Sequence, residues 1–155
     1  MPFFIRLFDQ DDRDFVLGLL PRLSGMDLPS WLTKTALDDF NQAAMQKAMD
    51  DMPADAALLI AVDESQSPAG FIYLTTEADY FTGEKLGYIS DLAVAPQAEG
   101  QGVGRLLMDA AEDWTREKGY RRLTLDVFAG NERARRVYEK AGFLPAVVKY
   151  AKIIE

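Results

Sequence analysis

The chain has 155 residues, 48% of them hydrophobic, and a formal net charge of −8 at pH 7. This length and hydrophobic content suffice for one domain with its own core. The negative charge argues against a nucleic-acid-binding protein and favours cationic small molecules or peptides as partners. The chain contains neither cysteine nor histidine, which excludes disulfides, thiolate nucleophiles, imidazole bases and nearly every zinc or copper site. Without a signal-peptide pattern or a run of about 18 apolar residues, we expect a soluble cytoplasmic protein that uses no metal.

Hydrophobic periodicity and turn residues divide the chain into strands and helices. In chain order these are a strand at 3–8, a helix from the acidic residues after 8 to Pro21, a helix at 31–52, strands at 56–62, 70–78 and 85–95, a helix at 105–118, a strand at 121–129, a helix at 131–140 and a strand at 146–154. The strands at 56–62 and 70–78 are predicted to pair as an antiparallel hairpin. The order β-α-α-β-β-β-α-β-α-β predicts one α/β domain over residues 1–155, a mixed sheet flanked by about four helices.

Three glycines at alternate positions, Gly100, Gly102 and Gly104, follow the strand at 85–95 and precede a helix. Such a loop presents unpaired backbone N–H groups and the positive end of a helix dipole, which together attract anions. A Cβ at these positions would hold phosphate oxygens away from the N–H groups. The spacing fits neither GxxxxGK[ST] nor GxGxxG. We predict a cradle for a pyrophosphate group, with a flexible surface loop as the alternative.

A second motif lies in the segment NERARRVYEKAGF at 131–143, where Asn131, Ala134 and Tyr138 are spaced to share one helix face. Together the two motifs resemble the GNAT N-acetyltransferase superfamily, in which a [QR]xxGx[GA] loop binds the pyrophosphate of acetyl-CoA and an NxxAxxxYxxxGF helix borders the pantetheine arm. The resemblance is specific over residues 86–143. It implies a GNAT-like fold and an acetyl-CoA-dependent N-acetyltransferase that acts on a primary amine of a small molecule or peptide.

The resemblance also implies the cofactor site. The strand residues at 92–94 would bind pantetheine and polarise the thioester carbonyl through their backbone N–H groups, a recognised way to stabilise a developing oxyanion. An ordinary core strand is compatible with the same residues, because the main chain does this work. The implied cofactor-binding residues are Leu92, Ala93, Val94, Glu99, Gly100, Gln101, Gly102, Val103, Gly104, Arg105, Asn131, Ala134 and Tyr138.

One position departs from the family pattern. Glu99 stands where the family carries Arg or Gln at the head of the loop, which costs a charge-assisted contact and places an anion beside an expected anion site. Gln97 and Arg105 are candidates to compensate, unless Glu99 simply turns to solvent. Arginines near the motifs are further candidates for a CoA phosphate, with solvated surface charge as the alternative; they are Arg121, Arg122, Arg133, Arg135 and Arg136.

Direct acetyl transfer needs a base for the amine and an acid for the departing thiolate. The resemblance places Tyr138 at the proton-donor position, and a phenol with an ordinary pKa of about 10 is able to protonate an alkyl thiolate; an aromatic packed on the sheet is the alternative. Tyr88 occupies the position where some relatives carry a carboxylate base, and Asp91 is the only acid in the segment 86–95. We expect water-relayed deprotonation assisted by Asp91 or Tyr88. Asp91 and Asp126 are equally compatible with structural roles.

The acceptor end of the site is specified less closely. The resemblance implies that the acceptor pocket is formed by the first two helices, their loop and the tip of a hairpin. The candidate residues for this pocket are Asp27, Trp31, Phe40, Tyr80, Phe81 and Glu84. Two other functions stay open, an acetyl-CoA-binding sensing or regulatory module with little catalysis and a transferase for a longer acyl-CoA. A homodimer through the last strands of the sheet is compatible with the sequence, which does not establish it.

Overall fold

The computed structural model describes residues 2–155 and contains a five-stranded sheet in the order β1-β2-β3-β4-β5. The helices and strands are β1 Phe4–Leu7, α1 Arg13–Leu19, α2 Lys34–Asp50, β2 Ala57–Val62, β3 Pro68–Ala78, β4 Lys85–Val94, α3 Val103–Glu117, β5 Leu123–Leu125 and α4 Glu132–Lys140, with 3₁₀ turns η1 Gln10–Asp12, η2 Leu20–Ser24 and η3 Pro96–Ala98. Strands β1 to β4 pair antiparallel in sequence, and β5 runs parallel to β4. The predicted mixed sheet and hairpin are confirmed.

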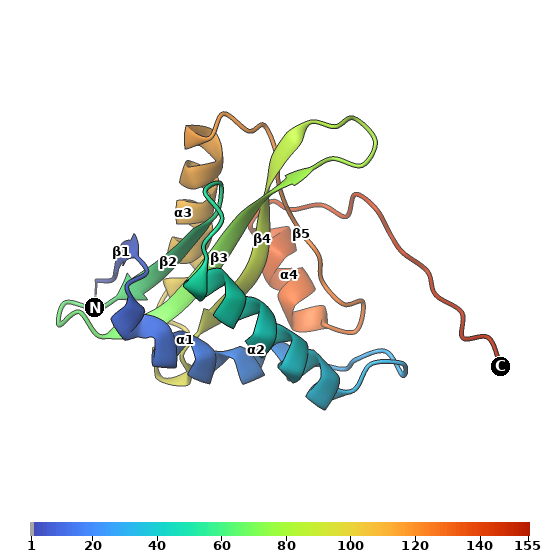
Figure 1. Cartoon of the computed structure of the whole chain (residues 1–155), viewed down its shortest axis with the longest axis horizontal. Coiled ribbons are helices and arrows are strands. Elements are labelled where there is room, and N and C mark those ends of the chain that lie inside the picture. The colour runs from blue at the N-terminus through green and yellow to red at the C-terminus, as the bar shows by residue number, and fades with distance from the viewer. Residues whose placement is uncertain (1) are drawn as a thin grey trace.

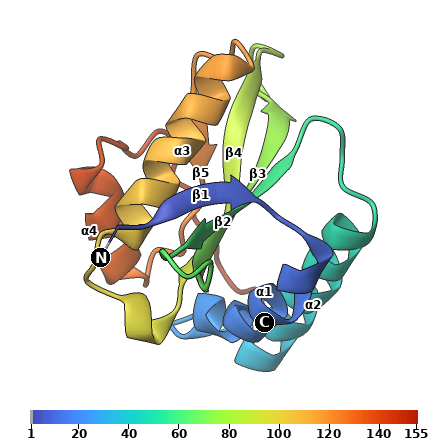
Figure 2. The same ribbon diagram turned by 90° about the vertical axis from the view of Figure 1, so that its left-hand side faces the viewer.

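Helices cover both faces of the sheet (Figures 1 and 2): α3 lies on one face, and α1 and α2 lie on the other. The apolar stripe of α3 is fully buried at Leu107 and Ala111, while Val16 and Leu20 are buried on the opposite side. Gly70 on β3 leaves room for both β4 and α3, because a Cβ there would lie 2.8 Å from the carbonyl oxygen of Ala93 on β4 and 3.2 Å from the side chain of Val103 on α3. Within residues 2–155 no helix is long and apolar enough to cross a membrane.

Strand β4 is irregular in two ways near its middle. Tyr73 pairs with Asp91 and Leu74 with Ile89, so Ser90 is an extra residue that forms a β-bulge. On its other edge, β4 pairs with β5 through only three residues and ends that pairing at Ile89. Beyond this point β5 no longer pairs with β4, which leaves one backbone edge of residues 90–94 without a partner strand.

The C-terminal part of the chain differs most from the prediction. The strand expected at 121–129 is reduced to Leu123–Leu125. The strand predicted at 146–154 is wrong, because residues 144–155 carry no secondary structure and are exposed throughout. Alternation identifies a segment that is able to pair, but a strand also needs a neighbouring edge. Figure 1 shows this segment running away from the sheet instead.

The helix predicted at 31–52 begins later, at Lys34, because Thr33 caps it by accepting a hydrogen bond from the Ala36 N–H at 3.1 Å. Pro21 does not end the preceding helical path, which continues as the 3₁₀ turn η2 to Ser24. This continuation places Arg22 and the residues that follow η2 against the carboxyl end of β4.

Candidate active site

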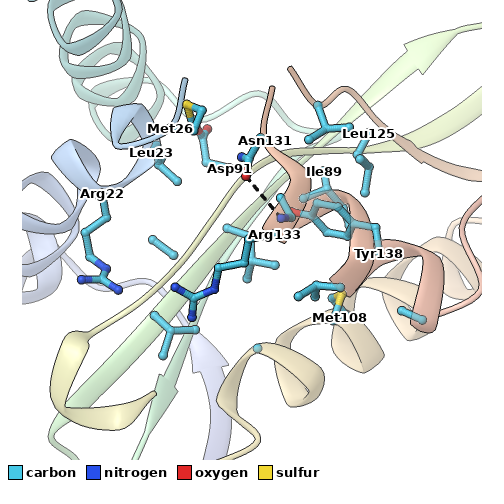
Figure 3. Close-up of a pocket in the computed structure, with 18 of the residues that line it drawn as sticks. Arg22, Leu23, Met26, Ile89, Asp91, Met108, Leu125, Asn131, Arg133 and Tyr138 are labelled. Carbon is cyan, nitrogen blue, oxygen red and sulfur yellow. Dashed lines mark hydrogen bonds between the residues drawn. The ribbon is translucent and has the colours of Figure 1, made fainter. Parts of the chain in front are cut away.

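A cavity of about 670 Å³ opens where β4 and β5 stop pairing (Figure 3). Its walls come from the second half of β4, the glycine loop with the start of α3, the continuation of β5 at 126–128, helix α4, and residues of η2 and α2. Segments that the sequence singled out separately therefore meet at one cavity. The predicted residues that line it are Asp91, Leu92, Ala93, Val94, Glu99, Gly100, Gly102, Val103, Gly104, Arg105, Asn131, Ala134 and Tyr138.

The glycine loop has the geometry of an anion site. Gly100 and Gly102 have φ angles of +76° and +85°, a left-handed conformation that other residues rarely adopt. Helix α3 starts directly after Gly102, which provides no side-chain cap, and its first helical bond runs from the Leu106 N–H to the Gly102 carbonyl at 3.0 Å. The N–H groups at 103–105 therefore lack partners within the helix. A Cβ on Gly100 or Gly102 would meet no atom within 4 Å, so the space over the loop is open.

Glu99 does not turn to solvent. Its carboxylate forms an ion pair with Arg22 from η2, and its second oxygen lies 4.0 Å from a guanidinium nitrogen of Arg133 on α4. Figure 3 shows both arginines at the cavity. Arg105, the other candidate to compensate, lines the cavity and pairs with Asp109 on its own helix at 3.4 Å. Two guanidinium groups from distant parts of the chain neutralise the acid at the head of the loop.

Gln101 and Gln97 contact each other instead of the cavity: the Gln101 side chain donates to the Gln97 carbonyl at 3.1 Å, and neither residue lines the cavity wall. Five arginines near the motifs were candidates for a CoA phosphate. In the part of the chain that the structure describes, Arg133 is the one of these five that lines the cavity. Arg122 instead pairs with Asp79 at 3.1 Å and Glu84 at 3.6 Å, near the hairpin between β3 and β4.

Asp91 and Tyr138 face the cavity from β4 and α4 (Figure 3). Burial raises the pKa of Asp91, although a hydrogen bond from the Ser90 hydroxyl at 2.9 Å opposes this shift. Burial also raises the pKa of Tyr138, and the negative charge of Asp91 adds to the effect. The Tyr138 ring packs edge-on against Phe143 with centroids 5.8 Å apart. Tyr138 therefore combines a packing role with access to the cavity.

Asn131 fixes the start of α4. Its side-chain oxygen accepts a hydrogen bond from the Ala134 N–H at 3.2 Å, the dashed line in Figure 3. This N-cap explains the first part of the NxxAxxxY spacing. The cap orients α4 so that Ala134 and Tyr138 line the cavity together with Asn131.

Tyr88 does not line the cavity. Its hydroxyl donates to Asp126 at 2.7 Å, and burial, followed by the interaction with Asp126, raises the pKa of Tyr88. Asp126 does line the cavity, so Tyr88 reaches the site only through this carboxylate.

The residues that the sequence suggested for the acceptor end do not line this cavity. Among the candidates, Trp31, Phe40, Tyr80 and Phe81 are 61% to 92% exposed and do not line the cavity, nor does Glu84; Asp27 lines only a smaller adjoining hollow. The wall is formed instead by Leu23, Met26, Leu37 and Asn41. Leu37 and Asn41 lie four residues apart on one face of α2, a spacing visible in the sequence.

The chain is similar to known acetyltransferases in sequence and in fold. Residues 26–143 match the Acetyltransferase (GNAT) family. The chain is 43% identical over 88 residues to a mycothiol acetyltransferase of Propionibacterium freudenreichii subsp. shermanii, an alignment that covers 57% of this chain and 28% of that protein. It is 31% identical over 93 residues to an aminoglycoside N(6')-acetyltransferase type 1 of Stenotrophomonas maltophilia, covering 58% of this chain and 61% of that protein.

The chain thus spans 28% and 61% of the length of these two relatives. Its fold is similar to the solved structure of a putative acetyl transferase from Pyrococcus furiosus, with a TM-score of 0.78 and 21% identity over 99% of this chain and 100% of that one.

Proposed function

The chain belongs to the Acetyltransferase (GNAT) family, and from that premise we propose that it transfers the acetyl group of acetyl-CoA directly to a primary amine of a small molecule or peptide. One observation carries the proposal: the cavity beside β4 joins the uncapped start of α3, the free edge of β4, and the pair Asp91 and Tyr138. The first two features would bind acetyl-CoA, and the two side chains would transfer the protons of the reaction.

The loop and the strand would hold the acetyl-CoA. The N–H groups at 103–105 would bind the pyrophosphate, and the open space above Gly100 and Gly102 leaves room for its oxygens. The unpaired backbone edge of residues 92–94 would bind the pantetheine arm and direct an N–H group at the thioester carbonyl. The thioester supplies an activated acetyl group when it is bound.

Arg22 and Arg133 would supply the positive charge that the loop lacks at position 99. Both guanidinium groups lie at Glu99 beside the glycine loop, and the three side chains together carry one net positive charge. A phosphate oxygen that reaches this cluster would therefore meet net attraction rather than repulsion. The departure of Glu99 from the family pattern is in this way compatible with cofactor binding.

The proton steps fall to Asp91 and Tyr138. A carboxyl group whose pKa is raised by burial is a stronger base than an ordinary aspartate, so the Asp91 carboxylate would accept the amine proton through a water molecule. Tyr138, whose pKa is also raised, keeps its proton at neutral pH. It would donate that proton to the departing thiolate.

The acceptor would be a cationic amine with an apolar body. Asp91 and Asp126 place negative charge in the cavity, and Leu23, Met26 and Leu37 add apolar surface. The net charge of −8 favours the approach of cations. The two relatives are a mycothiol acetyltransferase and an aminoglycoside N(6')-acetyltransferase, which supports an enzyme over a module that only senses acetyl-CoA.

The test is an assay of thiol release from acetyl-CoA with a panel of polyamines, amino acids, aminoglycosides and short peptides. Amine-dependent release, with acetylated amine as the product, supports the proposal and identifies the acceptor. Acetyl-CoA binding without release for any amine of the panel would favour the sensing module. Competition between acetyl-CoA and longer acyl-CoAs separates acetyl transfer from transfer of a longer chain.

A further inference from the structure

Four carboxylates gather beside the cavity without an ion-pair partner among the residues that the structure describes. These four, here called the acidic face, are Asp55 in the loop between α2 and β2, Glu77 on β3, Asp91 on β4 and Asp126 after β5. The arginine of the adjoining hairpin does not neutralise them, because Arg122 is held by Asp79 at 3.1 Å and by Glu84 at 3.6 Å. The acidic face therefore attracts a cation from solution.

The register of the sheet brings two tyrosines to this face together with Asp91. Asp91 pairs with Tyr73 on β3, and Tyr88 pairs with Thr75, two residues further along β3. Residues two apart on a strand share a face, so Asp91, Tyr88 and Tyr73 point to the same side of the sheet. The bulge at Ser90 makes this possible, because Asp91 and Tyr88 are three residues apart.

Contacts extend the same surface from the cavity towards the hairpin. The Tyr88 hydroxyl donates to Asp126 at 2.7 Å and so holds this carboxylate in the cavity wall. Burial raises the pKa of Glu77, and the charge of Asp126 raises it further, so the two carboxylates lie near each other. Four residues of extended strand separate Glu77 from Tyr73, a distance of about 14 Å. Negative charge is thus spread along a line instead of being gathered at one point.

Tyr73 adds a hydroxyl that has no partner. The residue is only 8% exposed, and its hydroxyl forms no hydrogen bond with the described residues, in which every fully buried side-chain nitrogen or oxygen has one. The hydroxyl therefore retains contact with solvent. Burial raises the pKa of Tyr73, and the charges of Asp91 and Asp55 add to the effect, so the hydroxyl faces these two carboxylates. A ligand that enters between them would complete its hydrogen bonding.

The spacing of the charges selects the kind of cation. Within residues 2–155 no group of three or more acidic side chains is arranged to hold a metal ion. Ammonium groups at intervals along a flexible chain fit a line of separated carboxylates, and tyrosine rings favour both the cations and the methylene groups between them. We propose that the acidic face binds the distal ammonium groups of a linear polyamine whose terminal amine reacts beside Asp91. This inference rests on the acetyl transfer proposed above and narrows its acceptor.

Calorimetric titration with spermidine and with butylamine, in the presence of CoA, measures binding apart from chemistry. Both amines carry a terminal amino group on a butyl chain, but only spermidine carries further cations. We expect spermidine to bind at least about tenfold more tightly, and Glu77→Gln to remove most of this preference. Glu64→Gln, an exposed position in the turn at the other end of β3, makes the same charge change and should retain it. A spermidine affinity no higher than that of butylamine, or an equal loss in both variants, would overturn the proposal.

Acetylation rates with the same two amines separate this inference from the proposed function. The ratio of kcat/KM for spermidine to kcat/KM for butylamine should fall about tenfold in Glu77→Gln and in Asp126→Asn, and should not fall in Glu64→Gln. Acetylation of butylamine with spermidine no better a substrate would leave the transfer intact and overturn the polyamine site. Spermidine binding that depends on Glu77, without an acetylated product, would support the acidic face as a polyamine site and overturn the transfer instead.

Discussion

Arg22 in the η2 turn is ion-paired with Glu99 at the head of the glycine loop, 77 residues further along the chain. The contact joins the first helical layer to the loop that precedes α3. Arg133 approaches the same carboxylate at 4.0 Å from the first turn of α4. Glu99 thus holds two guanidinium groups beside the glycine loop. For the phosphate binding that we propose, we expect the balance among these three charges to set the affinity of the loop.

Glu99→Gln should tighten the binding of CoA and acetyl-CoA. The substitution removes one negative charge beside the loop and frees two guanidinium groups, so we expect the dissociation constant to fall about threefold to tenfold, equivalent to roughly 1 kcal/mol. Calorimetric titration measures this. Glu112→Gln, on the exposed surface of α3, makes the same charge change and should leave the constant unchanged. Unaltered or weaker binding in Glu99→Gln would contradict the competition between this acid and the phosphate.

Arg22→Ala should weaken CoA binding about tenfold, because it removes a cation and leaves Glu99 less neutralised beside the phosphate. Arg116→Ala is the control: Arg116 is also an exposed arginine in an ion pair, with Asp113 at 3.0 Å, and does not line the cavity. The comparison is made by titration at several salt concentrations, since added salt should reduce the difference between the two variants. Equal affinities for the two variants would remove Arg22 from the cofactor site.

Tyr138→Phe should keep the affinity for acetyl-CoA and lower kcat at least tenfold. The phenylalanine ring preserves the packing against Phe143, so only the hydroxyl proton is lost. Steady-state rates with the best amine, beside a titration of the variant with acetyl-CoA, separate catalysis from binding. A kcat equal to that of the unmodified protein would leave Tyr138 with a packing role alone.

Asp91→Asn tests the base through its pH dependence. Burial raises the pKa of Asp91, so the carboxylate needed for catalysis forms at a higher pH than in an ordinary aspartate, and kcat/KM should rise through that pKa. The variant should lose this limb of the profile. A limb that persists in Asp91→Asn would assign the base elsewhere.

The same shift predicts an effect on stability. With its pKa raised in the folded state, Asp91 binds more protons folded than unfolded between its two pKa values, so its contribution to stability declines as the pH rises through that window. Asp91→Asn should therefore raise the Tm at neutral pH. In acid it should have little effect, because the protonated carboxyl of Asp91 and the amide that replaces it are both uncharged. Thermal unfolding followed by circular dichroism at both pH values measures the difference, and a lower Tm at neutral pH would contradict it.

Local sequence determines the parts of the site that were predictable. Gly100 and Gly102 need positive φ angles, Asn131 caps α4, and the spacing of Ala134 and Tyr138 brings both to one face. These features depend on neighbours within a few residues. The positions of most strands along the chain followed in the same way from short apolar or alternating runs bounded by turn residues.

The features that were missed depend on contacts between distant segments. The ion pair of Arg22 with Glu99 requires η2 and the glycine loop to meet, and no spacing in the sequence encodes that contact. The bulge at Ser90 changes which residues of β4 face the cavity without a turn residue to mark it. The strand expected at 146–154 has the composition of a strand, but composition does not encode a neighbouring sheet edge, and the segment pairs with no strand in the structure.

The central claim is that the cavity beside β4 binds acetyl-CoA through the glycine loop. Calorimetric titration of the unmodified protein with acetyl-CoA, repeated with Gly102→Val, tests it most directly. The account predicts a dissociation constant in the micromolar range for the unmodified protein, as is common for enzyme substrates, and severe loss in the variant, whose side chain would occupy the open space over the loop and strain its φ of +85°. Absence of binding to the unmodified protein, or equal binding by a folded Gly102→Val, would contradict the account.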